Sequence, residues 1–195
     1  GLDLARAAAR DRALAAIGEM GIGNTTSAAA LVCAYAGVPP EEAAGRGTGL
    51  DSPGLARKIQ VLERALNRVR TSDPFGILAE LGGFEIAAMA GFLLGAAAER
   101  LPVVVDGFIA GTAALAAVRI VPACRDYMIF SHQSAERGHA RLLELLEARP
   151  LVALDMRLGE GTGAALAIGM LDAALALYNG MATLASAGVS GASEG

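Results

Sequence analysis

GEMGIGNTT, residues 18–26, is the stretch that most strongly predicts the fold of this chain. An apolar run at 13–17 precedes it and an alanine-rich segment at 27–36 follows it, so we predict a strand, a glycine turn and a helix. Gly21 and Gly23 allow a tight turn and a close approach to a ligand. Asn24 is a good helix cap, and the free N–H groups of the first helical turn would face an anion such as phosphate. Glu19 places a carboxylate beside this anion site, which indicates catalysis.

The same alternation of apolar run, turn and helix recurs in the second half of the chain. We predict further strands at 101–105, 127–130 and 151–154, followed by helices at 108–118, 135–147 and 164–177. Between residues 57 and 100 the pattern is helical, with an apolar stripe in 59–69 and a second helix at 84–98. Such alternation is typical of a Rossmann-like α/β fold, a parallel sheet with helices on both faces.

Length and composition favour one domain. We assign residues 1–189 of the 195-residue chain to the α/β domain and expect the tail, 190–195, to be mobile. The net charge of -4 offers no basic surface for nucleic acid. Cys33 and Cys124 lie in separate apolar runs, so we expect buried free thiols in a reducing cytoplasm. The first residues resemble the middle of a helix rather than a signal peptide, which suggests a fragment of a longer protein.

The apolar composition raises the question of a membrane span. The longest runs without charge are 86–98, 107–118 and 161–171. Each is shorter than the roughly 20 apolar residues that span a bilayer. We therefore expect buried helices and no membrane partner.

In open parallel sheets, ligands bind at the carboxyl ends of the strands. The predicted strand ends carry unusual residues, namely Glu19 with its glycine loop, Asp106-Gly107, Ser131-His132-Gln133-Ser134 and the segment 157–163, RLGEGTG. A further glycine loop at 45–49, GRGTG, and Lys58 add to this set. Glycine loops, acids and cations that converge would fit a phosphorylated substrate and an acid–base step.

Six motifs, in order, resemble those of the nicotinate mononucleotide:dimethylbenzimidazole phosphoribosyltransferase family. They are GEMGIGNTTSAAAL, GRGTGLD, LGGFEIAAMAGF, PVVVDGFIAGTAAL, SHQSAERGH and MRLGEGTGAALA. The resemblance implies transfer of phosphoribosyl from nicotinate mononucleotide to dimethylbenzimidazole, which gives α-ribazole phosphate and nicotinate for the lower nucleotide loop of cobalamin. It also implies a homodimer that needs no cofactor and no metal, and an N-terminal portion in family members that this chain lacks.

The resemblance assigns catalysis to two acids. Glu160 matches the family's general base, which would take the N–H proton of the incoming base from a dry pocket. Glu19 matches a second acid that faces the same pocket. For both residues the competing interpretation is a carboxylate that stabilises the positive end of a helix.

The resemblance also implies a set of substrate-binding residues. Backbone donors would come from Gly21, Gly23, Asn24, Gly45 and Gly47, and the counter-charges of the phosphate would be Lys58 and Arg157, with Gly107, Leu158 and Gly159 beside them. Asp106 would hold the ribose hydroxyls or orient Lys58. The competing interpretations are a solvated helix face for Lys58 and a helix cap near Phe108 for Asp106.

Three further alternatives stay open. His132, Glu136 and His139 could share a helical face as a metal site, but we expect hydrogen-bonding roles, with His132 near the pocket. The chain could be a non-catalytic module that binds a nucleotide or a benzimidazole. Its alanine-rich faces could instead serve mainly in dimer assembly.

Overall fold

The computed structural model describes residues 1–46 and 49–188, so the predicted contact Gly47 and the predicted tail, 190–195, lie outside the described residues. Its centre is a parallel sheet of β1 (Ala15–Ile17), β2 (Val103–Val105) and β3 (Met128–Phe130), in the order β1-β2-β3. Ile17 pairs with Val105, and Val105 pairs with Phe130. The carboxyl ends of all three strands are therefore level, which confirms the predicted parallel sheet.

The strand predicted at 151–154 is wrong. Val152 forms an isolated parallel bridge with His132, and the segment makes no further ladder. Ala153 and Leu154 are exposed, so they have no surface to pack against. Asp155 then adopts a left-handed conformation (φ 51°), and the carbonyl of the next residue, Met156, accepts a hydrogen bond from the Ala135 N–H at 3.0 Å.

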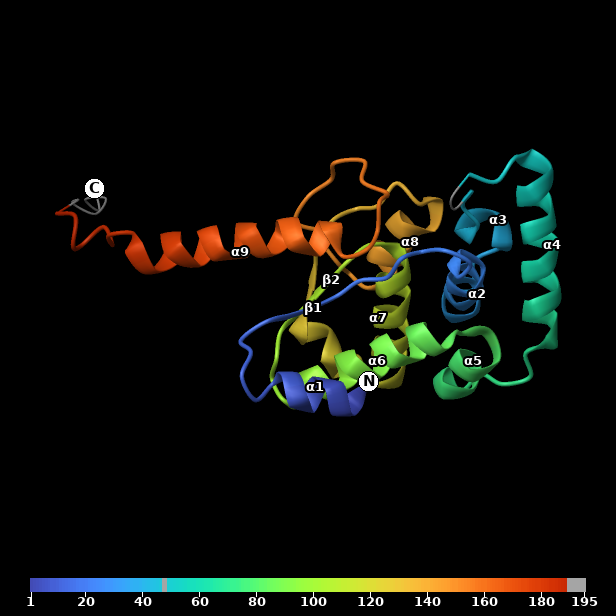
Figure 1. Cartoon of the computed structure of the whole chain (residues 1–195), viewed down its shortest axis with the longest axis horizontal. Coiled ribbons are helices and arrows are strands. Elements are labelled where there is room, and N and C mark those ends of the chain that lie inside the picture. The colour runs from blue at the N-terminus through green and yellow to red at the C-terminus, as the bar shows by residue number, and fades with distance from the viewer. Residues whose placement is uncertain (47–48, 189–195) are drawn as a thin grey trace, which may run out of the picture.

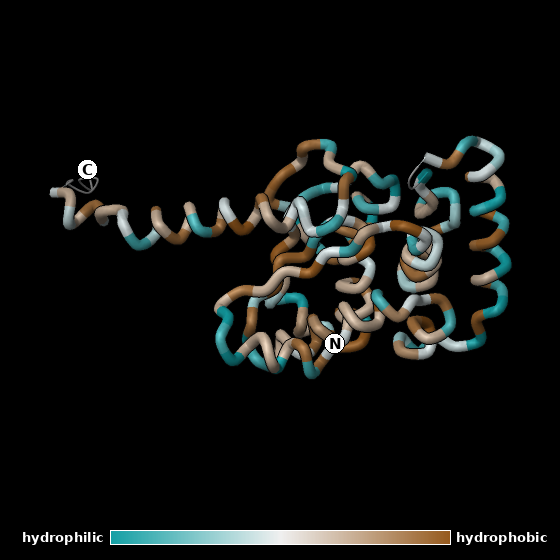
Figure 2. The backbone as a smooth tube through the Cα atoms, in the orientation of Figure 1, coloured by the Kyte–Doolittle hydropathy of each residue, from teal (hydrophilic) through white to brown (hydrophobic). Residues whose placement is uncertain are grey.

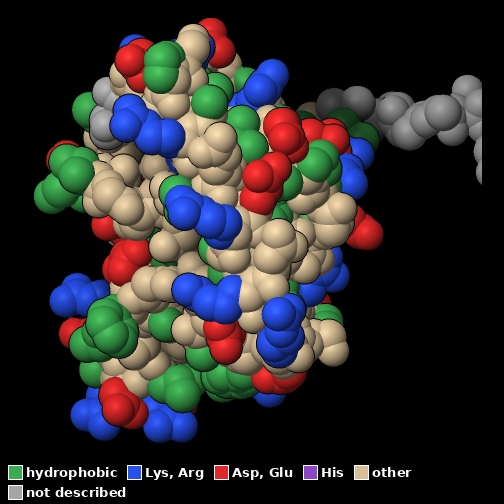
Figure 3. Space-filling model, turned by 90° about the vertical axis from the view of Figure 1, so that its right-hand side faces the viewer, with side chains coloured by type: hydrophobic (Ala, Val, Ile, Leu, Met, Phe, Trp, Pro, Cys, Tyr) green, Lys and Arg blue, Asp and Glu red, His purple; other side chains and the backbone are tan. Residues whose placement is uncertain are grey.

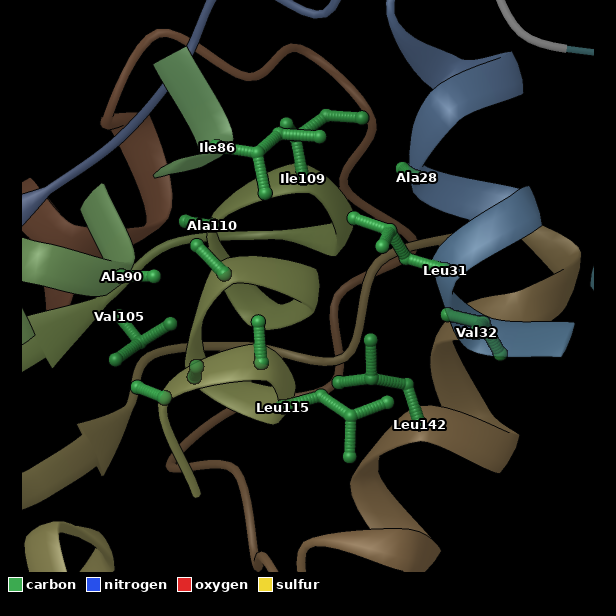
Figure 4. Packing of buried hydrophobic residues seen from close by; sticks show 14 of the residues in the cluster. Ala28, Leu31, Val32, Ile86, Ala90, Val105, Ile109, Ala110, Leu115 and Leu142 are labelled. Carbon is green, nitrogen blue, oxygen red and sulfur yellow. The ribbon is translucent and has the colours of Figure 1, made fainter. Parts of the chain in front are cut away.

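The main core surrounds α7 (Phe108–Ile120), which follows β2 directly. Almost every side chain of α7 from Phe108 to Ala117 is buried, because α2 (Thr25–Ala36), α6 (Phe84–Ala98) and α8 (Arg137–Leu145) pack around it. Its five alanines allow these neighbours to approach closely, and Leu31, Ile86 and Leu142 fill the gaps between the helices (Figure 4). The predicted helices at 108–118, 135–147 and 84–98 are confirmed.

Two short helices were not predicted as separate elements, although the second lies within the helical pattern of residues 57–100. α3 (Pro40–Ala43) and α5 (Pro74–Leu81) each begin with a proline in the first turn, where the missing N–H costs nothing. A proline pair is typical of the end of a helix, and Pro39-Pro40 does follow the end of α2. Pro40 is nevertheless also the first residue of α3. Asp73 caps α5 by accepting a hydrogen bond from the Gly76 N–H at 2.8 Å. The first helix, α1 (Leu2–Ala8), packs on α6, as its helical pattern predicted.

The long amphipathic helix α4 (Ser52–Arg68) lies at the edge of the molecule farthest from α9 (Thr162–Gly180) (Figure 1). It buries Lys58 and Leu62 against the body and leaves most of its charged side chains outside. Figure 3 shows that basic and acidic side chains are interspersed on this side of the molecule. This side therefore presents no continuous basic surface.

The two faces of the sheet are covered unequally. Val103 and Val105 belong to the main core, whereas Val104 packs against Ala164 and Ala167 of α9 on the opposite face. Helices thus cover both faces, as predicted, but α9 is the main cover of the second face within the described residues. Beyond Leu171 the side chains of α9 are exposed, and the helix projects from the body (Figure 1).

By length and composition, α9 is the one helix in residues 1–46 and 49–188 that could cross a membrane. The expectation that no segment is long enough was based on runs without charge, and α9 continues through Asp172. Ala164 and Ala167 are buried against the sheet, and a charge near the centre of a span costs about 2.5–3.5 kcal/mol.

Candidate active site

A cleft of about 380 Å³ opens at the carboxyl ends of the three strands, where the sheet topology predicts a ligand. It brings together loops that lie far apart in the sequence. Its described lining residues come from the glycine loop, the start of α7, the end of β3 and the loop before α9, and they include Glu19, Met20, Gly21, Thr25, Asp106, Gly107, Phe108, Ile109, Ala110, His132, Ser134, Glu136, Arg157, Leu158 and Gly159. The predicted convergence of strand-end loops is therefore confirmed.

In the loop after β1, the carboxylate of Glu19 bends back onto its own chain. It accepts a hydrogen bond from the N–H of Gly21, which adopts φ 81°. Gly21 lines the cleft, whereas Gly23 and Asn24 are not among its lining residues. Asn24 is the N-cap of α2 but makes no side-chain cap bond, contrary to the expectation. Its Nδ2 donates to Glu85 Oε1 at 3.3 Å, and its buried Oδ1 has no hydrogen-bond partner among the described residues.

The backbone of Glu160 joins the Glu19 loop. The N–H of Glu160 donates to the carbonyl of Glu19 at 2.8 Å, and both residues line a second hollow of about 460 Å³. This hollow adjoins the first cleft, because Glu19 and Met20 line both. The two predicted acids therefore lie beside one another. Glu160 is exposed and Glu19 is half-buried, so the described residues do not form the dry pocket expected around them.

Asp106 has partners that the sequence did not predict. Its side chain is 3% exposed, and its Oδ2 and Oδ1 accept hydrogen bonds from the N–H groups of Gly161 (3.1 Å) and Ala164 (3.0 Å). The carboxylate thus caps α9, not α7 as the competing interpretation held. Neither Lys58 nor another cation bonds to it among the described residues, and its contact with a ribose stays a prediction.

The two histidines lie in the buried region next to Asp106. His132 Nδ1 is 3.6 Å from Asp106 Oδ1 and 2.9 Å from Ser131 Oγ, and the ring lines the cleft. His139 Nδ1 accepts a hydrogen bond from the Ser134 N–H at 2.8 Å. Burial lowers the pKa of His139 from 6.5 to about 3, with a smaller effect from His132. Within the described ranges, no group of three or more His, Cys, Asp or Glu residues could hold a metal ion.

Lys58 is 7% exposed, so its interpretation as a solvated helix face is wrong. Its Nζ donates to Thr25 Oγ1 at 3.0 Å and to the Gly45 carbonyl at 3.1 Å. Burial lowers the pKa of Lys58, and the negative charge of Glu136 partly opposes this effect. Lys58 does not line the cleft but bonds to Thr25, which does, and so joins the start of α2 to the loop at Gly45, while a direct phosphate contact stays a prediction.

The exposed Arg157 is the cation that lines the cleft, as predicted, and Leu158 and Gly159 follow it. Several lining residues, among them Met20 and Thr25, were not assigned to the site from the sequence. Ser134 was noted at a predicted strand end and Glu136 as a possible metal ligand, but neither was given a role in substrate binding. The first turn of α7, Phe108–Ala110, presents helix N–H groups to the cleft, and its position directly after β2 could have revealed it.

Comparisons with known proteins agree with this geometry. A family model described as phosphoribosyltransferase matches residues 1–189. A nicotinate-nucleotide–dimethylbenzimidazole phosphoribosyltransferase of Chlorobium chlorochromatii is 57% identical over 180 residues, which cover 91% of this chain and 51% of that protein. The protein of the same name from Desulforamulus reducens is 51% identical over 193 residues, covering 97% of this chain and 55% of its own length.

The crystal structure of CobT from Thermus thermophilus superposes with a TM-score of 0.91 at 48% identity, covering 97% of this chain and 57% of that one. This chain therefore spans about half the length of the curated relatives that it matches. The family match over almost the whole chain and the same fold in a solved relative together establish the family. The chain belongs to this phosphoribosyltransferase family.

Proposed function

We propose that this chain forms the phosphoribosyl-binding part of an enzyme that transfers phosphoribosyl from nicotinate mononucleotide to dimethylbenzimidazole. The products would be α-ribazole phosphate and nicotinate, in the assembly of the cobalamin nucleotide loop. The observation that carries the proposal is the backbone bond between Glu160 and Glu19, because it brings two acids to the edge of a cleft lined by a helix N-terminus. The names of the relatives support the same substrates.

The cleft offers two kinds of contact for the phosphate of the nucleotide. The first turn of α7, at Phe108–Ala110, provides backbone N–H donors and the positive end of a 13-residue helix. Arg157 supplies an exposed positive charge from the loop before α9. Glu19 and Glu136 are acids, so we expect them to accept hydrogen bonds from ribose hydroxyls rather than to face the phosphate.

The second hollow fits the incoming base. Ala16, Met20, Ala164 and Ile168 give it apolar surface suited to a flat aromatic ring, and Glu160 lies on its lining. One nitrogen of the base would attack the anomeric carbon as the bond to nicotinate breaks, and the electron pair of that bond goes to the pyridine nitrogen. The N–H proton on the other nitrogen would go to the Glu160 carboxylate. This sequence of bond changes balances charge without an added reactant.

A chromatographic assay of nicotinate release tests the proposal. We expect Glu160→Gln to bind nicotinate mononucleotide with a Kd within about threefold of the parent and to lose at least roughly 100-fold in kcat, the usual share of a general base. Glu147→Gln is a matched control, because Glu147 is also an exposed glutamate with positive φ (49°), at the end of α8. Equal turnover by Glu160→Gln and the parent would remove Glu160 from this role.

A second candidate function is a binding domain without turnover. The exposure of Glu160 and Arg157 favours it, because exposed groups are held less firmly and are screened by water. Calorimetry would then detect binding of nicotinate mononucleotide, and the addition of dimethylbenzimidazole would release no nicotinate. Nicotinate release by this chain rejects this alternative.

We also propose a cytoplasmic homodimer that binds neither nucleic acid nor membrane. The two buried free cysteines support a reducing compartment. The exposed apolar side chains of α9, which include Leu175, Leu177 and Tyr178, support association through that helix. Figure 2 shows that hydrophobic positions recur along the projecting helix. The interspersed charges around α4 support the absence of a nucleic-acid surface (Figure 3).

A further inference from the structure

The loop that carries Glu160 has an unusual backbone. Gly159, Glu160 and Gly161 all adopt positive φ, at 78°, 58° and 78°. A glutamate in the left-handed region costs about 1 kcal/mol or more, so it persists only where its surroundings hold it there. The structure therefore has to contain contacts that fix this turn.

Two hydrogen bonds hold the turn, one to a backbone carbonyl and one to a side chain. On one side, the N–H of Glu160 donates to the carbonyl of Glu19 at 2.8 Å. On the other side, the N–H of the next residue, Gly161, donates to Asp106 Oδ2 at 3.1 Å. Successive N–H groups of the chain are thus bound by two different strand ends.

Asp106 also fixes the helix that follows. Its Oδ1 accepts from the N–H of Ala164 at 3.0 Å, and Gly161, the N-cap of α9, has no side chain to do so. A carboxylate at this position stabilises the positive end of the helix. Asp106 itself is anchored, because its N–H donates to the Ile17 carbonyl at 3.0 Å and its side chain is buried beside His132.

The packing around this carboxylate leaves little freedom. A Cβ at Gly163 would overlap the His132 imidazole and lie 2.7 Å from Asp106 Oδ1. A Cβ at Gly18 would lie 2.7 Å from the Cα of Gly161. The segments after all three strands therefore pack closely against the start of α9, with Asp106 among the contacting residues.

We infer that Asp106 is a positioning residue, which sets the place of the Glu160 carboxylate by capping α9 across the sheet. The inference deepens the proposed transfer reaction and rests on it for the role of Glu160. Both carboxylate oxygens of Asp106 accept hydrogen bonds from the start of α9, which links Asp106 to the Glu160 turn through the backbone of Gly161.

The variant Asp106→Asn tests the inference, because it removes the charge and turns one acceptor into a donor that faces a backbone N–H. We expect hydrogen exchange at Gly161 and Ala164 to rise at least roughly tenfold relative to the amides of α7. Asp73→Asn is the matched control, since it makes the same substitution at the cap of α5, whose residues do not line the cleft, and should leave these amides unchanged. Unchanged exchange at Gly161 and Ala164 in Asp106→Asn would overturn the inference, whether or not the chain is active.

A kinetic cycle separates positioning from a general structural effect. We expect Asp106→Asn to lower kcat with KM for nicotinate mononucleotide within about threefold of the parent. In a Glu160→Gln background the same change should then alter kcat by less than about twofold, because the carboxylate it positions is already gone. An equal loss in both backgrounds would overturn the positioning role, while absence of nicotinate release by the parent chain would count against the proposed function alone.

Discussion

His139 should make the fold sensitive to mild acid, and His139→Asn should remove that sensitivity. The imidazole is 1% exposed, and its Nδ1 is already occupied by the Ser134 N–H. A proton can therefore bind to the folded protein only at the cost of that hydrogen bond and of a buried charge. Asparagine places an oxygen near the position of Nδ1 and keeps the acceptor, but it does not titrate.

The sign and size of the effect follow from the two pKa values. The folded-state pKa is lowered to about 3, so below 6.5 the unfolded chain takes up a proton that the folded chain refuses. Stability is therefore lost as the pH falls from 6.5 toward 3. At about 1.36 kcal/mol for each pH unit, the free energy of unfolding that is lost through His139 is roughly 2 kcal/mol between about pH 7.5 and about pH 5.

Urea unfolding at these two pH values measures the effect. On acidification, we expect the free energy of unfolding of the parent to fall by roughly 2 kcal/mol more than that of His139→Asn. This difference does not depend on the stability of the variant at the higher pH. Leu142→Val is the control, because it opens a small cavity in the same buried region without removing a titrating group. Its free energy of unfolding should depend on pH as strongly as that of the parent. An equal pH dependence of the free energy of unfolding in His139→Asn and the parent would refute this account of the buried imidazole.

Three other predictions concern the site and α9. Gly163→Ala should lower the free energy of unfolding by about 1–3 kcal/mol, because the new methyl group overlaps the His132 imidazole. Gly169→Ala should raise it by up to about 1 kcal/mol, because its Cβ meets nothing within 4 Å. Equal melting temperatures of the two variants would contradict this contrast. The lowered pKa of Lys58 means that the parent gains stability as the pH rises toward 10.5, and Lys58→Met should lose that gain in urea titrations at alkaline pH. Leu177→Ser with Tyr178→Ser should weaken self-association in sedimentation velocity, and an unchanged sedimentation coefficient at equal concentration would exclude α9 from the contact.

Much of the architecture could be predicted because it depends on local pattern. Three of the four predicted strands and the helices after β1, β2 and β3 are present, since β-branched runs and helical periodicity act over a few residues. The fourth strand failed because pairing also needs a covered surface, and Leu154 has none. The helices α3 and α5 were missed because a proline ends one helix and starts the next by the same restriction of φ.

The sequence by itself determined the α/β alternation, the loops that form the cleft and the family of the chain, because each of these is recorded in short ordered motifs. Tertiary structure alone decided the partners of the charged groups. Asp106 caps a helix that begins 56 residues later, and Lys58 is buried between the start of α2 and the loop at Gly45 rather than solvated. A carboxylate or an ammonium group takes whichever donors or acceptors the fold places around it, and which strand ends are neighbours is a property of the sheet as a whole.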